Sequence, residues 1–313
     1  MCGLAGYLHY GKTEIKNLDV LTNALAREAA VRGTDATGIA FVEKGRLYIQ
    51  KDGKPAYKMD FKHSGKVGAV TIHTRHTTCG KASRNRNNHP FCGRVGSAGN
   101  SQFMLEHNGV ILNEAEIKTK YNLPKTDIET DSYVAVQLLE YTKKLDENSI
   151  KFMAENVEGS FSFSILDNKG TLWLVKGDSP LHILHFPDIK MYVYASTEEI
   201  LWKALINTGL FEELKKGRFE VVPIHGGDIL KISSDGKVTC SKFNYRDYSR
   251  NSFCNWRNYT FGNDEFEYSY VDDLKSVASY YGYSPDTVDE MVADGFSPYE
   301  IEEYMCAEYW GEI

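Results

Sequence analysis

Apolar residues along the first 242 positions follow two periods, one typical of helices and the other typical of strands. Between residues 17 and 31 they recur three or four positions apart, which predicts an amphipathic helix with one buried face. The residues on that face are Leu18, Leu21, Leu25 and Ala29. Helices are also predicted at 114–121, 131–143, 150–156 and 197–207, the last with Thr197 as its N-cap.

Short apolar runs separated by turn residues predict the strands. Runs at 39–42 and 47–50 flank Glu43-Lys44-Gly45-Arg46 and predict a β-hairpin, and runs at 160–166 and 171–176 predict another. Further strands are expected directly after Cys2 and at 67–72, 103–106, 191–195, 218–222, 228–232 and 237–242. Because strands lie at both ends of this region with helices between them, we expect an α+β sandwich of two sheets covered by helices.

Charge divides the chain into a body and a tail. The formal net charge is -7, but residues 264–313 hold fourteen acids against the single cation Lys275, a net of -13. We therefore expect a body at 1–242, a polar, aromatic linker at 243–270 and an acidic tail at 271–313. Ser284-Pro285 and Ser297-Pro298 each resemble an N-cap followed by a first-turn proline, which predicts short helices in the tail. A solvated, partly disordered acidic end is the alternative.

Several classes of protein are disfavoured by composition. The sequence has no run of eighteen apolar residues and no amino-terminal secretion signal, so we expect a cytoplasmic protein without a membrane span. Its six cysteines lack short C-x-x-C spacing, which argues against a disulfide scaffold. The basic stretch at 81–94 is a weak argument for nucleic-acid binding, because the whole chain is acidic.

The most reactive candidate is Cys2, which directly follows the initiator methionine. Once Met1 is removed, Cys2 carries both a thiol nucleophile and a free α-amine. An α-amine with a reference pKa of about 7.7 to 8.0 can act as a general base at neutral pH. Taken alone, Cys2 could equally be a small apolar residue at the start of a strand.

Other motifs follow Cys2 in a recognisable order. They are Cys2-Gly3, Arg32-Gly33-Thr34-Asp35, His73-Thr74-Arg75 with Thr78 and Gly80, Asn88-His89-Pro90, His107-Asn108-Gly109 and Thr130-Asp131. Together they resemble the class II glutamine amidotransferases, the amino-terminal nucleophile (Ntn) glutaminase domains found in enzymes such as glucosamine-6-phosphate synthase. The resemblance covers residues 2–242 and implies a four-layer αββα sandwich with two antiparallel sheets. It implies neither a cofactor nor a metal.

The resemblance also implies catalytic roles. The Cys2 thiolate attacks the side-chain amide of glutamine and forms a thioester, while the Cys2 α-amine transfers the proton to ammonia. The amide of Asn108 and the backbone N–H of Gly109 stabilise the oxyanion. Arg32 orders water and side chains near Cys2.

Substrate-binding roles follow from the same resemblance. Arg75 holds the glutamine carboxylate with assistance from Thr78, and Asp131 holds the α-ammonium group. The sequence departs from the family at His76 and Cys79, where an aromatic residue and a histidine often stand. Only about seventy residues follow the body, so we expect the partners to be L-glutamine and a separate enzyme that accepts ammonia.

Two alternatives remain open from the sequence. One is a zinc-stapled binding module, whose ligands would come from His73, His76, Cys79, His89 and Cys92. The other is an Ntn cysteine amide hydrolase that acts on a substrate other than glutamine. The pair of Arg75 and Asp131 favours glutamine, because together they can bind both charges of an α-amino acid.

Overall fold

The computed structural model describes two units of the chain. It describes residues 2–245 except 13–14, 16, 97–98, 100, 209, 211, 213–215 and 217, and then residues 275, 278, 283–294, 301 and 304. The units are Met1–Arg250 and Asn251–Ile313. Among the described residues, no helix is both long enough and apolar enough to cross a membrane.

A seven-stranded antiparallel sheet forms around the strand that follows Cys2, within the described residues. Its strands are β1 (Gly3–His9), β2 (Ala36–Glu43), β3 (Arg46–Asp52), β4 (Ala69–Arg75), β9 (His182–Phe186), β10 (Met191–Ala195) and β11 (Glu220–Val221). They are ordered β11-β9-β10-β1-β4-β2-β3. Ala5 of β1 lies opposite Ala195 of β10 and Ile72 of β4, so Cys2 precedes a central strand.

The second sheet has six antiparallel strands in the described part of the chain, ordered β13-β12-β8-β7-β6-β5. They are β5 (Phe91–Val95), β6 (Ser101–Ile111), β7 (Gly159–Asp167), β8 (Leu172–Lys176), β12 (Asp228–Ile232) and β13 (Val238–Lys242). β6 pairs with β7 along nine residues, from Phe103 opposite Asp167 to Ile111 opposite Gly159.

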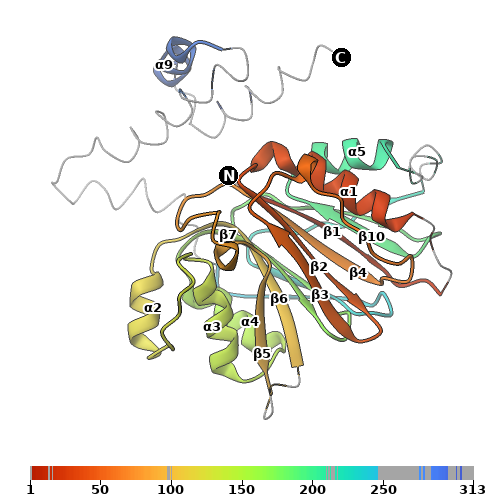
Figure 1. Ribbon diagram of the computed structural model, residues 1–313, viewed down its shortest axis with the longest axis horizontal. Helices are drawn as coiled ribbons and strands as arrows, with labels where there is room; N and C mark the ends of the chain where they lie inside the picture. Colours follow the sequence, from red (N-terminus) through yellow and green to blue (C-terminus); the bar gives the residue numbers. More distant parts are fainter. Residues whose placement is uncertain are drawn as a thin grey trace. The chain divides into compact units, whose positions relative to one another are not determined.

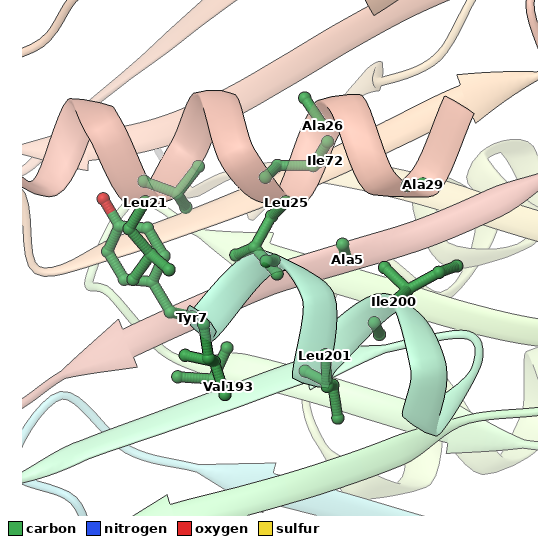
Figure 2. Packing of buried hydrophobic residues seen from close by; sticks show 14 of the residues in the cluster. Ala5, Tyr7, Leu21, Leu25, Ala26, Ala29, Ile72, Val193, Ile200 and Leu201 are labelled. Carbon is green, nitrogen blue, oxygen red and sulfur yellow. The ribbon is translucent and has the colours of Figure 1, made fainter. Parts of the chain in front are cut away.

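Helices cover the outer face of each sheet (Figure 1). α1 (Leu18–Ala29) and α5 (Glu198–Ile206) pack on the first sheet, whereas α2 (Glu114–Lys120), α3 (Tyr133–Thr142) and α4 (Glu147–Asn156) pack on the second. Figure 2 shows Leu25 of α1 and Leu201 of α5 on the same side of the sheet as Val193 of β10. Burial of these apolar side chains is the main force that holds helices to sheet.

The layer between the two sheets changes character along the strands. Away from Cys2 it is an apolar core that includes Leu8, Leu174 and Ile232. Closer to Cys2 the same layer contains buried polar side chains, among them Glu106 and Asn108 on β6. Alternate residues of a strand share a face, so these two side chains both point toward the first sheet. The polar part of this layer leads to the candidate site.

The expected α+β sandwich of two antiparallel sheets between helical layers is confirmed. The sequence did not predict β5 or β9, which are five residues each. The strand expected at 103–106 is longer in the structure, so that His107-Asn108-Gly109 lies within it and not after its end. β6 continues to Ile111, since pairing with β7 extends the ladder through the motif.

Residues 243–245 belong with the body in this structure, although the linker was expected to begin there. Phe243 is 6% exposed and joins the core beneath α3 and α4, and the backbone N–H of Asn244 donates to Glu155. The remainder of the expected linker, from 246 to 270, lies outside the described residues.

The second unit contains α9 (Pro285–Ala293), as the tail sequence predicted. The side chain of Ser284 accepts a hydrogen bond from the backbone N–H of Thr287, and Pro285 occupies the first turn. Val288 is fully buried and clusters with Ala278 and Ile301. The second predicted cap, Ser297-Pro298, lies outside the described residues.

Candidate active site

Cys2 directly precedes β1, where both its side chain and its backbone carbonyl form hydrogen bonds. The Cys2 Sγ lies 3.4 Å from the backbone nitrogen of His76, which donates to it, and 3.5 Å from the His76 carbonyl oxygen. The carbonyl of Cys2 accepts a hydrogen bond of 2.9 Å from Arg32 Nε. The sulfur is thereby fixed against the loop that follows β4.

The surroundings of Cys2 change the pKa of its thiol in two opposite directions. Burial raises the pKa of the Cys2 thiol, because removal from water disfavours the thiolate. The His76 N–H and the positive charges of Arg75 and Arg32 lower that pKa. A thiolate formed here is therefore stabilised by groups that are already in place.

One pocket brings together residues from several distant parts of the sequence. Its lining residues are Cys2, Arg75, His76, Thr78, Cys79, His89, His107, Gly109, Thr130, Asp131 and Ser132. They come from the start of β1, the end of β4 and its following loop, β6, and the segment that precedes α3. A thiol, a guanidinium and a carboxylate thus share a single concave surface.

Arg75 organises the loop between β4 and β5, residues 76–90, which supplies part of the pocket lining and is called the covering loop below. Its Nη1 donates to Asn88 Oδ1 over 2.7 Å, and its Nη2 donates to the carbonyls of Cys79 and Gly80. Asn88 Nδ2 in turn donates to the carbonyl of Ala82. The arginine is 3% exposed, so its charge is held in the pocket wall and does not extend into solvent.

Asp131 is fixed on the opposite side by β6. Its Oδ2 accepts a hydrogen bond of 2.7 Å from the backbone N–H of Ile111. The residue is 9% exposed, and it lies in the segment just before α3. Extension of β6 beyond Gly109 is what brings the Ile111 N–H to this carboxylate.

Glu129, two residues before Asp131, connects this segment to the covering loop. Its backbone N–H donates to Asn87 Oδ1, and its carboxylate accepts from Asn87 Nδ2 and from Arg84. The Cys79 thiol donates to the Glu129 carbonyl. The loop that carries the contacts to Arg75 is therefore closed onto the segment that carries Asp131.

Asn108 and Gly109 lie side by side in β6. Gly109 lines the pocket, whereas Asn108 is a buried neighbour whose Nδ2 donates to Ser196 Oγ at 3.4 Å. A Cβ at position 109 would lie 2.0 Å from the Ser160 carbonyl oxygen, and the φ of Gly109 is +135°. Only glycine fits this backbone, because other residues would meet both strain and a clash.

Burial disfavours the charged form of three histidines at this site, of which His89 and His107 line the pocket. Burial lowers the pKa of His73 to about 3, and it also lowers the pKa of His89 and of His107. His73 Nε2 lies 3.0 Å from the His107 carbonyl oxygen, which requires its ring N–H to donate there. The rings of His73 and His89 contact each other with their centroids 4.0 Å apart and their planes tilted by 32°.

The zinc alternative finds no support in this arrangement. Within the described residues, no group of three or more histidine, cysteine, aspartate or glutamate side chains is placed to hold a metal ion. Cys79 and Cys92 are exposed thiols, whereas His73 and His89 lie in the interior. The five candidate ligands are therefore not gathered around one point.

The structure brings most of the predicted site residues together. Cys2, Arg75, Thr78, Gly109 and Asp131 all line the pocket. The other two lie next to the lining residues: Arg32 donates to the Cys2 carbonyl, and Asn108, the neighbour of Gly109, is buried between the sheets.

Other residues that shape the site had no role in the sequence interpretation. Asp35 accepts from the backbone N–H of Thr77 at 2.7 Å, and Asn88 accepts from Arg75. Both belong to motifs noted in the sequence, which could have directed attention to them. Ser196, which contacts Asn108, belongs to no motif and gave no signal.

Comparisons of sequence relate part of this chain to glutamine-dependent enzymes. A family profile described as a glutamine amidotransferase domain matches residues 80–203. A glutamine–fructose-6-phosphate aminotransferase (isomerizing) of Staphylococcus aureus strain Mu50 is 35% identical over 196 residues, covering 58% of this chain and 30% of that protein. The same enzyme of Streptococcus agalactiae strain NEM316 is 32% identical over 195 residues, with equal coverage. The chain therefore spans less than a third of the length of these relatives.

Solved structures share the fold. The glutamine phosphoribosylpyrophosphate amidotransferase of B. subtilis, complexed with ADP and GMP, superposes with a TM-score of 0.61 at 19% identity, covering 78% of this chain and 50% of that one. A structure described as the allosteric regulatory enzyme of purine biosynthesis has a TM-score of 0.60, with the same identity and coverage. The matching family profile and the curated relatives support a glutamine amidotransferase domain of class II within the first unit, and the solved structures share its fold.

Proposed function

We propose that this domain hydrolyses the side-chain amide of L-glutamine through a thioester on Cys2. One observation carries the proposal: a single pocket holds the Cys2 thiol, the Arg75 guanidinium and the Asp131 carboxylate. A nucleophile beside two fixed groups of opposite charge suits a zwitterionic amino acid with a reactive side chain. This arrangement favours glutamine over the neutral amides that other Ntn hydrolases cleave.

Substrate binding requires Arg75 to share its donors. In this structure Nη2 donates to the carbonyls of Cys79 and Gly80, so the incoming carboxylate competes with the covering loop for the guanidinium. Thr78 lines the pocket beside it and can donate its hydroxyl to the same carboxylate. Binding of glutamine is therefore coupled to a movement of this loop.

The proposed chemistry begins with attack of the Cys2 thiolate on the amide carbon of glutamine. The negative charge moves to the carbonyl oxygen, where the Asn108 amide and the Gly109 N–H stabilise it. Collapse of this intermediate breaks the C–N bond, and the protonated α-amine of Cys2 gives its proton to the departing ammonia. Water then attacks the thioester, which releases glutamate and restores the thiol.

We assign this proton transfer to the α-amine and not to the buried histidines. His73 has a pKa of about 3 and commits a ring nitrogen to the His107 carbonyl. A base that is unprotonated and hydrogen-bonded in the interior cannot supply a proton to ammonia at neutral pH. The mechanism accordingly requires removal of Met1, which frees the amine of Cys2.

Purified protein tests the proposal directly. Intact-mass analysis should show a chain that begins at Cys2, and incubation with glutamine should release equal amounts of glutamate and ammonia. Cys2→Ala should lose all activity, whereas Cys92→Ala, which removes an exposed thiol of β5, should keep it. Full activity with Met1 retained, or in Cys2→Ala, would refute the mechanism. Turnover of other amides but not of glutamine would favour the alternative Ntn hydrolase.

We also propose that the ammonia is used by a separate acceptor enzyme. The relatives are named glutamine–fructose-6-phosphate aminotransferases, which supports transfer of nitrogen from glutamine to an acceptor. A tail with a net charge of -13 supports docking to a basic partner surface. Deletion of residues 264–313 should preserve glutaminase activity and abolish partner capture. Altered glutaminase activity without any partner would instead indicate that the tail acts on the body.

A further inference from the structure

Ser196 connects the two halves of the proposed catalytic machinery. It follows β10 directly, it is 0% exposed, and its backbone N–H donates to the Leu4 carbonyl. Its Oγ accepts from the Leu4 backbone N–H at 2.8 Å and from Asn108 Nδ2 at 3.4 Å. One hydroxyl thus contacts β1, two residues beyond Cys2, and also β6 of the other sheet.

One arrangement of the hydroxyl satisfies all of these contacts at once. A serine Oγ has a single hydrogen to donate and two lone pairs to accept with. That hydrogen is directed at the Leu4 carbonyl oxygen, 3.3 Å away. Both lone pairs then face N–H donors, one from Leu4 and one from Asn108. In this arrangement the nitrogen end of the Asn108 amide faces Ser196.

The orientation of Asn108 depends on this contact. Its Oδ1 is buried and has no hydrogen-bond partner among the described residues. Its neighbour across the ladder, Ser162, gives its hydroxyl to the Ser179 carbonyl instead. Without Ser196, no described side chain would distinguish the two ends of the amide. A reversed amide would present an oxygen to the developing oxyanion and would repel it.

We propose that Ser196 is a positioning residue for glutamine hydrolysis, which fixes the Asn108 amide with its nitrogen available to the oxyanion and at a constant place relative to Cys2. The inference rests on the proposed function of the pocket. Asn108 Nδ2 has two hydrogens, so one can remain on Ser196 while the other serves the oxyanion. Because the oxyanion exists only in the transition state and intermediate, Ser196 should affect kcat and leave KM nearly unchanged.

A purely structural role for Ser196 predicts a different result. Its contacts with Leu4 also close the end of the β1–β10 ladder. If this were its only role, Ser196→Ala would lower stability equally whether position 108 is asparagine or alanine. A double-mutant cycle separates the two roles, because it measures the coupling between Ser196 and Asn108 and cancels effects on the ladder. Ser164→Ala is the matched control: Ser164 is equally buried between the sheets, but its hydroxyl bonds Tyr194.

The experiment compares glutaminase kinetics of wild type, Ser196→Ala, Asn108→Ala, the double variant and Ser164→Ala. Direct removal of an oxyanion donor typically costs about a hundred- to a thousandfold in kcat, so loss of its support should cost about ten- to a hundredfold. The double variant should be no slower than Asn108→Ala alone. The proposal is overturned if Ser196→Ala matches Ser164→Ala, or if the two losses multiply in the double variant.

A second measurement does not depend on turnover. With ¹⁵N-labelled asparagine, the side-chain NH₂ signal of Asn108, assigned by its absence in Asn108→Ala, should be protected from solvent exchange in wild type. Ser196→Ala should reduce that protection, whereas Ser164→Ala should retain it. An inactive wild-type protein would refute the proposed function, and the exchange data would still decide whether Ser196 orients the amide. Unchanged protection in Ser196→Ala would overturn the inference.

Discussion

Substitution of Arg75 by lysine separates charge from geometry at the proposed carboxylate site. The guanidinium of Arg75 contacts three acceptors on the covering loop: Asn88 Oδ1 and the carbonyls of Cys79 and Gly80. A lysine keeps the positive charge, but it presents a single nitrogen and cannot form the planar, bidentate pair with a carboxylate. Arg75→Lys should therefore weaken both the loop and the substrate contact.

The magnitude follows from the number of contacts. A hydrogen bond to a charged group contributes about 1.5–3 kcal/mol, and each 1.4 kcal/mol corresponds to a factor of ten. Loss of one such bond to the glutamine carboxylate should raise KM by about ten- to a hundredfold. The effect on kcat should be smaller, because the carboxylate is bound in both the ground state and the transition state.

Steady-state release of glutamate across a wide range of glutamine concentrations measures this effect. Arg86→Lys is the control on the same loop, because Arg86 is about half exposed and its distance to Asp127 is 3.8 Å. It should leave both constants unchanged. If Arg75→Lys has the KM of wild type and the same melting temperature, Arg75 does not bind the carboxylate and the assignment fails.

Four further variants test other parts of the structure. Asn108→Ala should lower kcat about a hundred- to a thousandfold with little change in KM, and a loss below about threefold would remove it from the oxyanion site. Asp131→Asn should raise KM for glutamine at unchanged fold, since an amide oxygen can still accept from the Ile111 N–H but carries no charge for the α-ammonium; unchanged KM would contradict this role. Burial raises the pKa of Glu106 well above its usual range, so wild type should lose stability as the pH rises from the usual glutamate pKa toward this raised value, by about 1.4 kcal/mol per pH unit. Glu106→Gln should remove that slope in denaturant titrations at several pH values, and parallel curves would show that Glu106 ionises normally. Ser284→Ala should cost α9 about 0.5–2 kcal/mol, measured as faster amide exchange at 286–293, and unchanged exchange would show that Ser284 does not stabilise the helix as its cap.

Local sequence was enough to predict most elements of the body. α1 and the hairpin of β2 and β3 were predicted because their apolar periods and turn residues lie within one short segment. The caps at Thr197 and Ser284 were also predicted, since each side chain bonds an N–H three residues away. The order of motifs resembling class II amidotransferases further indicated Cys2 as the nucleophile.

The extents of individual strands depended on partners far away in the sequence. β6 continues through Asn108 and Gly109 because β7 supplies matching backbone groups, with Gly109 opposite Phe161. β9 forms because it lies between β10 and β11, which hold its backbone on both sides. A five-residue apolar run carries no information about such neighbours, so local propensity could not reveal these limits.

The sequence by itself supplied the candidate catalytic and binding residues, whereas the tertiary structure decided how their side chains are held. The motif order predicted that Arg75 and Asp131 bind the two charges of glutamine, and this role stays a prediction. That Asn88 and the Ile111 N–H hold these two side chains follows only from the packed loops and β6. Ser196 shows the difference most clearly, since it is 88 residues from Asn108 in sequence and meets it only where the two sheets face each other. Hydrogen bonds between such distant residues form because folding buries both groups together and removes water as their alternative partner.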